Sequence, residues 1–258
     1  MNLSEAVDLL PATSRNVVSV LSGGLDSSIM TMVLVHKYGP AAVKAVSYDY
    51  GQKQKIELTK AQALCAALGV DHTILDLSIL GDIAKPISAN ISGSDVAMPH
   101  IKEVLGDPQP KTYVPFRNMI LLSLTLAKAE ASGASHVFTG LQVHDQYGYW
   151  DTTNEFVSCM NALAAQNRSC QISIEAPFSH LSKWQEIDIC KELEIVTDFG
   201  PLSMLQHTMT CYNPNESGMS CGVCPSCSER IANFGKSGMV DPVPYSIDIP
   251  WSELCAQS

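Results

Sequence analysis

The sequence predicts an α/β protein with a doubly wound parallel sheet of five strands. Short β-branched apolar runs alternate along the chain with longer segments of helical periodicity, which is typical of βαβ units. The chain has 258 residues, of which 46% are hydrophobic and 16% are charged, as in an ordinary globular protein. This length accommodates one large domain, or one domain with a small appendage.

The first three strands and two helices are predicted within residues 1–77. Apolar runs indicate strands at 16–21, 42–48 and 71–77. The segments between them indicate helices at 26–38 and 54–68. Strands that alternate with helices in this way pair in parallel through right-handed crossovers, which leaves helices on both faces of the sheet.

Two irregular segments separate the remaining elements, and we expect both to be substrate loops. They span residues 78–112, rich in Gly, Pro, Ser, Asn and Asp, and residues 141–153, which are polar and aromatic. Plain disorder is the alternative for the first, which is longer than an ordinary connection. The other predicted elements are helices at 117–132, 155–166 and 183–193 and strands at 135–140 and 171–176.

Charge and the N-terminal segment limit the classes of partner. The formal net charge is −10, which argues against a broad basic surface for nucleic acid. No apolar run reaches the roughly 18 residues that a membrane span requires. Residues 1–16 lack the basic and apolar regions of a signal peptide. We therefore expect a cytoplasmic protein that acts on a small molecule and contacts neither nucleic acid nor membrane.

The stretch VLSGGLDSS at residues 20–28 predicts a loop that binds phosphate. It follows the first predicted strand and opens the first helix, whose N-terminal dipole favours an anion. The glycines let the backbone approach the ligand, and the serine hydroxyls can donate to phosphate oxygens. Asp26 fits beside an anion if it caps the helix or holds a magnesium ion. A tight turn without a ligand is the alternative, and the lysine of the common P-loop is absent.

Four of the nine cysteines crowd into one segment and predict a metal site. Their spacing is C-x9-C-x2-C-x2-C, at Cys211, Cys221, Cys224 and Cys227. In a reducing compartment such a cluster favours metal over disulfides. Four thiolates suit tetrahedral structural zinc, while an iron–sulfur cluster and cysteines without metal are the alternatives.

Several motifs together resemble one family. SGGLDS is similar to the signature of the pyrophosphate-loop (PP-loop) ATPases, the adenine nucleotide alpha-hydrolase-like (HUP) group. Four further segments resemble 7-cyano-7-deazaguanine synthases: SYDYGQKQKIEL (47–58), TYVPFRN (112–118), which contains VPFRN, TGLQVHDQYGYWDTTNEF (139–156), and TCYN before the spaced cysteines. The resemblance implies ATP-dependent conversion of 7-carboxy-7-deazaguanine and ammonia to the nitrile (preQ0), through an adenylated carboxylate and an amide. It also implies a PP-loop domain at 1–205, a zinc-binding segment at 206–258, and often a homodimer.

The resemblance also implies roles for individual residues. The pyrophosphate of ATP, with Mg²⁺, would be bound by the loop residues Leu21, Ser22, Gly23, Gly24, Leu25, Asp26, Ser27 and Ser28. Ser47 and Tyr48 would contact adenine through their backbone, and the catalytic residues would be Asp26, Ser27 and Arg117. The deazaguanine substrate would contact Arg117, Asn118, Asp145, Tyr147, Tyr149 and Asp151. A surface salt bridge for Arg117 and ordinary packing for the loop are the alternatives.

Two departures from the family pattern leave the product open. Gln54 occupies the place of a usual histidine, and GYWDTT replaces a GYPD segment that is followed by Cys-Arg. The enzyme could therefore stop at the amide, or pass the activated carboxylate to another acceptor. A different PP-loop ligase, such as a tRNA thiolase or a relative of NAD or asparagine synthetases, is a further alternative. A non-catalytic zinc-knuckle binding module is the last.

Overall fold

The predicted fold class is confirmed by a five-stranded parallel sheet in the order β3-β2-β1-β4-β5. The computed structural model describes residues 1–99, 110–142, 149–193 and 200–256. The strands are β1 (Val17–Val20), β2 (Val43–Asp49), β3 (Asp71–Asp76), β4 (His136–Thr139) and β5 (Ser173–Glu175). The central strand β1 pairs with β2 on one side and β4 on the other, so the crossovers diverge at β1 and β4. In such sheets ligands bind outside the carboxyl ends of the strands at this point.

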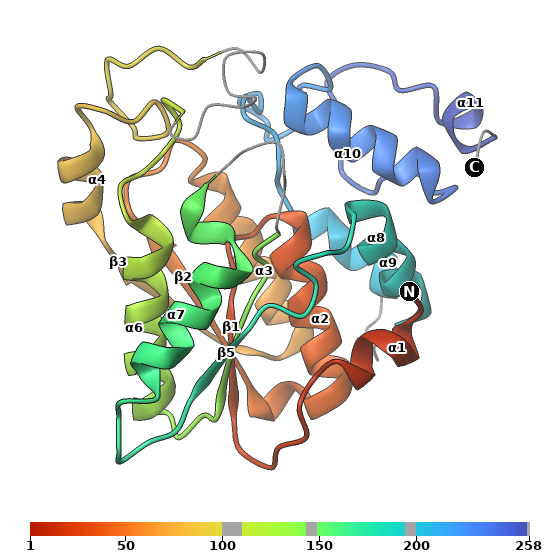
Figure 1. Cartoon of the computed structure of the whole chain (residues 1–258). Coiled ribbons are helices and arrows are strands. Elements are labelled where there is room, and N and C mark those ends of the chain that lie inside the picture. Colours follow the sequence, from red (N-terminus) through yellow and green to blue (C-terminus); the bar gives the residue numbers. More distant parts are fainter. Residues whose placement is uncertain (100–109, 143–148, 194–199, 257–258) are drawn as a thin grey trace.

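Helices cover both faces of the sheet. One face carries α2 (Leu25–Tyr38), α3 (Ile56–Leu68) and α8 (Lys183–Glu192), and the other carries α6 (Arg117–Ala131) and α7 (Asn154–Ala164). Figure 1 shows α6 and α2 on opposite sides of β1. These five helices are the five that the sequence predicts, with bounds that differ by a few residues.

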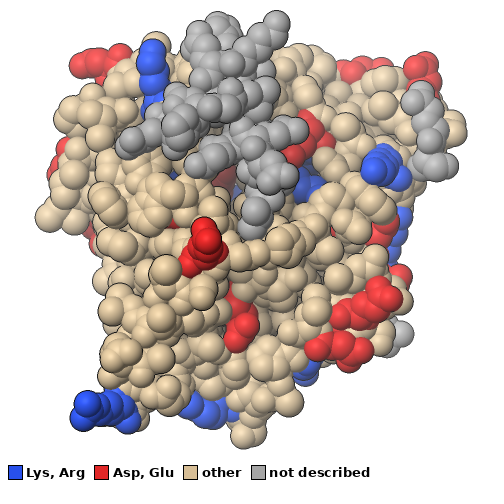
Figure 2. All heavy atoms as spheres, viewed as in Figure 1, with Lys and Arg blue, Asp and Glu red and all other residues tan. Residues whose placement is uncertain are grey.

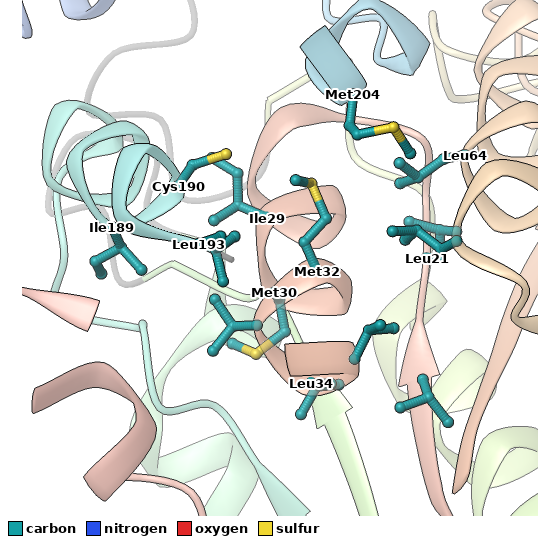
Figure 3. Packing of buried hydrophobic residues seen from close by; sticks show 14 of the residues in the cluster. Leu21, Ile29, Met30, Met32, Leu34, Leu64, Ile189, Cys190, Leu193 and Met204 are labelled. Atoms are coloured by element: carbon teal, nitrogen blue, oxygen red, sulfur yellow. The ribbon is translucent and has the colours of Figure 1, made fainter. Parts of the chain in front are cut away.

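The helix α2, which follows the phosphate loop, lies at the centre of the larger core, the buried hydrophobic cluster that α2 forms with α3 and α8. Of the eleven residues 25–35 of α2, ten are buried and Asp26 is the exception, so the helix is enclosed on nearly every side. Figure 3 shows Ile29, Met30 and Met32 of this helix between Leu193 and Cys190 on one side and Leu64 and Leu21 on the other. Each such side chain contributes about 1.5–3 kcal/mol by leaving water. Packing of this kind fixes the start of α2, and with it the loop.

Short elements add to the predicted ones. The segment 78–112 begins with a helix, α4 (Ser78–Ala84), which the sequence analysis did not predict. Other short additions are α1 (Leu3–Asp8), α9 (Pro201–Met204), α11 (Trp251–Cys255) and the 3-10 turns Pro40–Ala42, Trp150–Thr152 and Leu205–His207. The helix α10 (Pro225–Lys236) begins directly after Cys224 in the cysteine-rich segment. It packs on α8, and α11 packs on α10 (Figure 1).

Two observations concern the described helices and one face of the surface. In the described ranges, no helix combines the length and the apolar character that crossing a bilayer demands. On the face that Figure 2 displays, Lys and Arg side chains are separated from one another by neutral and acidic residues.

Candidate active site

The phosphate loop is held in shape by its own serines. The Ser22 and Ser27 hydroxyls are 2.9 Å apart, and the Ser22 N–H donates to Ser27 Oγ at 3.2 Å. Ser28 Oγ donates to the Gly24 carbonyl at 2.6 Å. These bonds bend the chain into a concavity at the N-terminus of α2, where free N–H groups and the helix dipole favour an anion.

Three other segments fix the position of this loop. Gly23 has φ +90°, and a Cβ there would lie 2.1 Å from the main-chain oxygen of Glu57 in α3. The carbonyl of Gly23 accepts the N–H of Met209 at 2.9 Å, from the cysteine-rich segment. A Cβ at Gly140, just after β4, would lie 3.0 Å from the Ser27 nitrogen. Only glycine permits such close backbone contacts, so packing sets the loop in place.

A cavity of about 460 Å³ opens beside the loop at the carboxyl ends of the strands. Its wall includes ten of the predicted site residues, namely Leu21, Ser22, Gly24, Asp26, Ser27, Tyr48, Arg117, Asn118, Tyr149 and Asp151. Four others, Gly23, Leu25, Ser28 and Ser47, are not part of the wall. Asp145 and Tyr147 lie outside the described residues. The size of the cavity is typical of small-molecule sites.

The side chains of Ser47 and Tyr48 hold β2 to its neighbours. Ser47 Oγ donates to the Leu21 carbonyl and lies 2.7 Å from His72 Nε2. The Tyr48 hydroxyl donates to the Leu121 carbonyl in α6 at 2.9 Å. Because both side chains are engaged in this way, a contact to adenine would fall to their backbone groups.

Arg117 and Asn118 open α6 at the cavity wall. The Arg117 guanidinium lies 3.4 Å from the Tyr50 hydroxyl and 3.3 Å from Asn118 Oδ1. Asp151 Oδ2 accepts the Asn118 N–H at 3.2 Å, which caps the first turn of the helix. Phe116, directly before Arg117, has φ 53°, a strained conformation for a bulky residue. This strained turn and the Asp151 cap together fix the start of α6 at Arg117.

Trp150, which departs from the family pattern, forms an aromatic cluster next to the cavity. Its ring packs edge-on against Phe116 at 5.4 Å and against Phe156 at 5.6 Å. Its indole N–H donates to the Tyr113 hydroxyl at 2.9 Å, and Tyr113 stacks on Tyr149. Trp150 thus holds the predicted substrate residue Tyr149 against the wall.

A second group of charges lies behind Asp26 and was not predicted. Glu186 of α8 is 1% exposed and accepts a hydrogen bond from Gln142 Nε2 at 2.6 Å. Burial, and then the charge of Asp26, raises the pKa of Glu186 well above its ordinary value. Lys183, at the start of α8, forms an ion pair with Glu229 of α10 at 2.7 Å. Burial alone would lower the pKa of Lys183, but Asp26 and Glu229 together raise it, so this amine is a cation beside the loop.

Glu57 is an ionisable residue of the wall that the sequence analysis did not assign to the site. It lies in the first turn of α3, directly against the phosphate loop. Burial raises the pKa of this carboxyl to about 8, and the positive charge of Arg117 acts in the opposite direction. Burial therefore favours the neutral form of this carboxyl over its charged form.

The four predicted metal ligands come together. Cys211, Cys221, Cys224 and Cys227 place their sulfur atoms within 4.8 Å of one another. Tetrahedral zinc with bonds of about 2.3 Å requires sulfurs about 3.8 Å apart, and Cys221 Sγ lies 3.9 Å from Cys227 Sγ. Backbone N–H groups donate to three of the sulfurs, as a thiolate requires. The donor set fits structural zinc.

A buried ion pair joins this metal segment to the loop. Arg230 of α10 is 2% exposed and forms two hydrogen bonds to Asp241, at 2.6 and 2.9 Å. It also donates to the Thr208 hydroxyl at 2.8 Å, and Thr208 precedes the residue that donates to Gly23. The Tyr245 hydroxyl donates to Asp241 at 2.7 Å. The cysteine-rich segment is therefore part of the structure that holds the predicted phosphate loop.

Comparison with known proteins identifies the family. The model of "Queuosine biosynthesis protein QueC" matches residues 16–238. The chain belongs to the QueC family. The 7-cyano-7-deazaguanine synthase of Psychrobacter cryohalolentis is 36% identical over 243 residues, which cover 90% of each chain. That of Paramagnetospirillum magneticum is 33% identical over 240 residues, covering 90% of this chain and 99% of the relative.

Among solved structures the likeness is weaker. The NH3-dependent NAD synthetase from Campylobacter jejuni shares 19% identity, with a TM-score of 0.43 over 76% of this chain and 75% of that chain. The family assignment rests on the sequence matches alone.

The QueC family motifs that the sequence displays lie around one cavity. The wall includes residues of SGGLDSS, of the DYGQ segment, of VPFRN and of GYWDTT, together with Tyr212 beside the first cysteine. Glu57 was not predicted as a site residue, although it lies within the family segment SYDYGQKQKIEL. Nor were Lys183 and Glu186, which lie far along the chain and carry no local motif that points to the loop.

Proposed function

We propose that the protein is a 7-cyano-7-deazaguanine synthase that converts 7-carboxy-7-deazaguanine and ammonia to the nitrile with ATP. The observation that carries the proposal is that the phosphate loop and Arg117 form one wall of one cavity, in a chain of the QueC family. ATP use is implied by the family. This chain aligns with 90% and 99% of the lengths of the two 7-cyano-7-deazaguanine synthases named above.

The chemistry explains why the loop lacks a P-loop lysine. A carboxylate is a poor electrophile because its oxygen is a poor leaving group, whereas an adenylated carboxylate releases AMP. The reacting atom of ATP is then the α-phosphorus, and no cation has to accompany a migrating γ-phosphoryl group. Ammonia displaces AMP to give the amide, and a second adenylation at the amide oxygen permits loss of AMP to the nitrile.

We assign ATP binding and substrate binding to residues around the cavity. The loop residues hold the pyrophosphate through N–H and hydroxyl groups, and Ser47 and Tyr48 contact adenine by their backbone. Arg117 attracts the substrate carboxylate or the α-phosphate by charge-assisted hydrogen bonds. Asn118, Tyr149 and Asp151 surround the deazaguanine ring, and we keep Asp145 and Tyr147 as substrate residues of the same loop.

The polar groups behind the loop fit a divalent cation. Asp26 and Glu186 supply carboxylate oxygens at the edge of the loop, a donor type that Mg²⁺ prefers. Bound there, Mg²⁺ would neutralise charge on the pyrophosphate as it leaves. The four cysteines would hold zinc in a closed structural site, because four thiolates leave no open position.

One experiment decides the product. Purified protein is incubated with ATP, Mg²⁺, ammonium and 7-carboxy-7-deazaguanine, and the products are separated and weighed by mass spectrometry. We expect the nitrile and AMP. Amide alone would replace the nitrile claim with an amide synthase, which is the outcome that the replaced GYPD segment leaves open. Sedimentation of the same sample tests the homodimer that the family resemblance implies.

A further inference from the structure

The Glu57 carboxylate lies on the cavity wall and forms no hydrogen bond or ion pair with any described residue. Across the described ranges, its oxygens have neither a hydrogen bond nor an ion pair within 4.0 Å. The other acidic groups of the wall are engaged, since Asp151 accepts the Asn118 N–H and Asp26 interacts with Glu186 and Lys183. Glu57 is therefore open to a ligand in the cavity.

Glu57 contacts the phosphate loop and lies within electrostatic reach of Arg117. Its main-chain oxygen packs against Gly23 of the phosphate loop, and its side chain is close enough to Arg117 to feel that charge. The Arg117 guanidinium donates a hydrogen bond to the Tyr50 hydroxyl. Tyr212, from the cysteine-rich segment, lies on the same wall. A substrate carboxylate that is adenylated between loop and Arg117 would therefore lie beside Glu57.

The reaction requires a proton acceptor at this place. Ammonium has no lone pair and cannot attack, and its nitrogen loses every hydrogen before it becomes a nitrile. A carboxylate in the cavity wall can accept the first of these protons.

We propose that Glu57 is the catalytic base that converts bound ammonium into the nucleophile. The carboxylate takes one proton from ammonium, which leaves ammonia and a neutral carboxyl group. The nitrogen lone pair forms the C–N bond to the adenylated carbon, the C–O bond to AMP breaks, and AMP leaves with the electron pair. The proton still in excess on nitrogen passes to water, and Glu57 returns its own to solvent before the next cycle. The assignment rests on the proposed function.

The environment of Glu57 suits this role. With the pKa of its carboxyl raised to about 8 by burial and opposed by Arg117, the ionised form is a much stronger base than an ordinary glutamate. A base closer in strength to ammonia takes its proton with less loss of free energy. Arg117 is the charged group that acts on Glu57, and Tyr50, Asp26 and Tyr212 lie on the same wall.

The test separates proton removal from every other step. Glu57→Gln keeps the shape and removes the base, Glu57→Asp keeps a carboxylate, and Glu155→Gln at an exposed site of α7 is the matched control. Each variant is assayed for substrate-dependent ATP–pyrophosphate exchange, which reports adenylation. Amide formation is then measured with ammonium, and hydroxamate formation with hydroxylamine, a nucleophile that is already unprotonated at neutral pH.

We expect Glu57→Gln to keep exchange near the wild-type rate and to lose about 100-fold in kcat/KM for ammonium. Its activity with hydroxylamine should stay close to wild type, Glu57→Asp should recover part of the ammonium rate, and Glu155→Gln should change nothing. Equal losses with both nucleophiles, or no loss with ammonium, would overturn the assignment while exchange persists. Absence of exchange in the wild-type protein would instead overturn the proposed function, and this assignment with it.

Discussion

Removal of the Arg230 charge tests how firmly the cysteine-rich segment is joined to the sheet. Arg230→Met would leave the Asp241 carboxylate, whose side chain is fully buried, without its bidentate partner. Removing one member of a buried ion pair typically costs about 3–5 kcal/mol. The Tyr245 hydroxyl and the Val243 N–H still donate to Asp241. We therefore expect a loss near the lower limit, about 3 kcal/mol, in the free energy of unfolding.

Urea unfolding followed by circular dichroism measures this loss, and a double variant tests its cause. If the cost comes from the orphaned charge, Arg230→Met with Asp241→Leu should recover most of it, because a buried pair is often replaced by apolar residues without penalty. A single-variant loss below about 1 kcal/mol, the range of an exposed pair, would refute the reasoning. So would a double variant that is less stable than the single one.

Three further predictions concern the loop, the metal and pH. Gly23→Ala should weaken ATP binding at least tenfold, or by about 1.4 kcal/mol, because the added Cβ would clash with the Glu57 carbonyl. Calorimetry measures this loss. Gly39→Ala controls for backbone strain alone, because Gly39 has φ +79° and a Cβ there would meet nothing within 4 Å. Cys224→Ser should lower zinc per chain and the melting temperature, whereas Cys159→Ser at an exposed position should change neither. Because the pKa of Glu57 is raised in the folded state to about 8 from 4.5, its contribution to stability is complete below pH 4.5 and is lost as pH rises through 8. Urea titrations across this window should show a smaller decline in stability for Glu57→Gln, and equal declines would contradict the pKa assignment.

The sequence predicts those parts of the fold whose signals are local. The five strands and the helices between them follow from apolar runs and helical spacing, and their order implies the parallel sheet. The helix α4 was missed because Gly81 lies within it, and glycine is a poor helix former. Gly81 is tolerated because it packs directly on Tyr50, where a Cβ would lie 2.4 Å from the carbonyl oxygen. That contact belongs to the tertiary structure and leaves no pattern in the sequence.

The site divides in the same way. The loop at 21–28 and the four cysteines each lie within one short segment, so their chemistry can be predicted from the sequence. Lys183 and Glu186 reach Asp26 only because α8 packs beside α2 in the larger core. Glu57 is a further case, since an acidic residue in the first turn of a helix is common and usually only complements the dipole. Its change of character arises from burial against the loop, which depends on the folded chain.

The absence of a lysine in the loop acquires a structural explanation from these charges. A P-loop lysine belongs to the loop and serves the β- and γ-phosphates. Here the cations come from other helices: Arg117 of α6 lines the same cavity as the loop, and Lys183 of α8 interacts electrostatically with Asp26. The loop itself is fixed by backbone contacts with Glu57 and Met209, so its N–H groups need no charged side chain to hold their shape. Under the proposed function, Arg117 would lie near the acceptor carboxylate and Lys183 near the leaving pyrophosphate, on either side of the α-phosphorus. This distribution of charge suits a reaction that breaks the α–β bond of ATP.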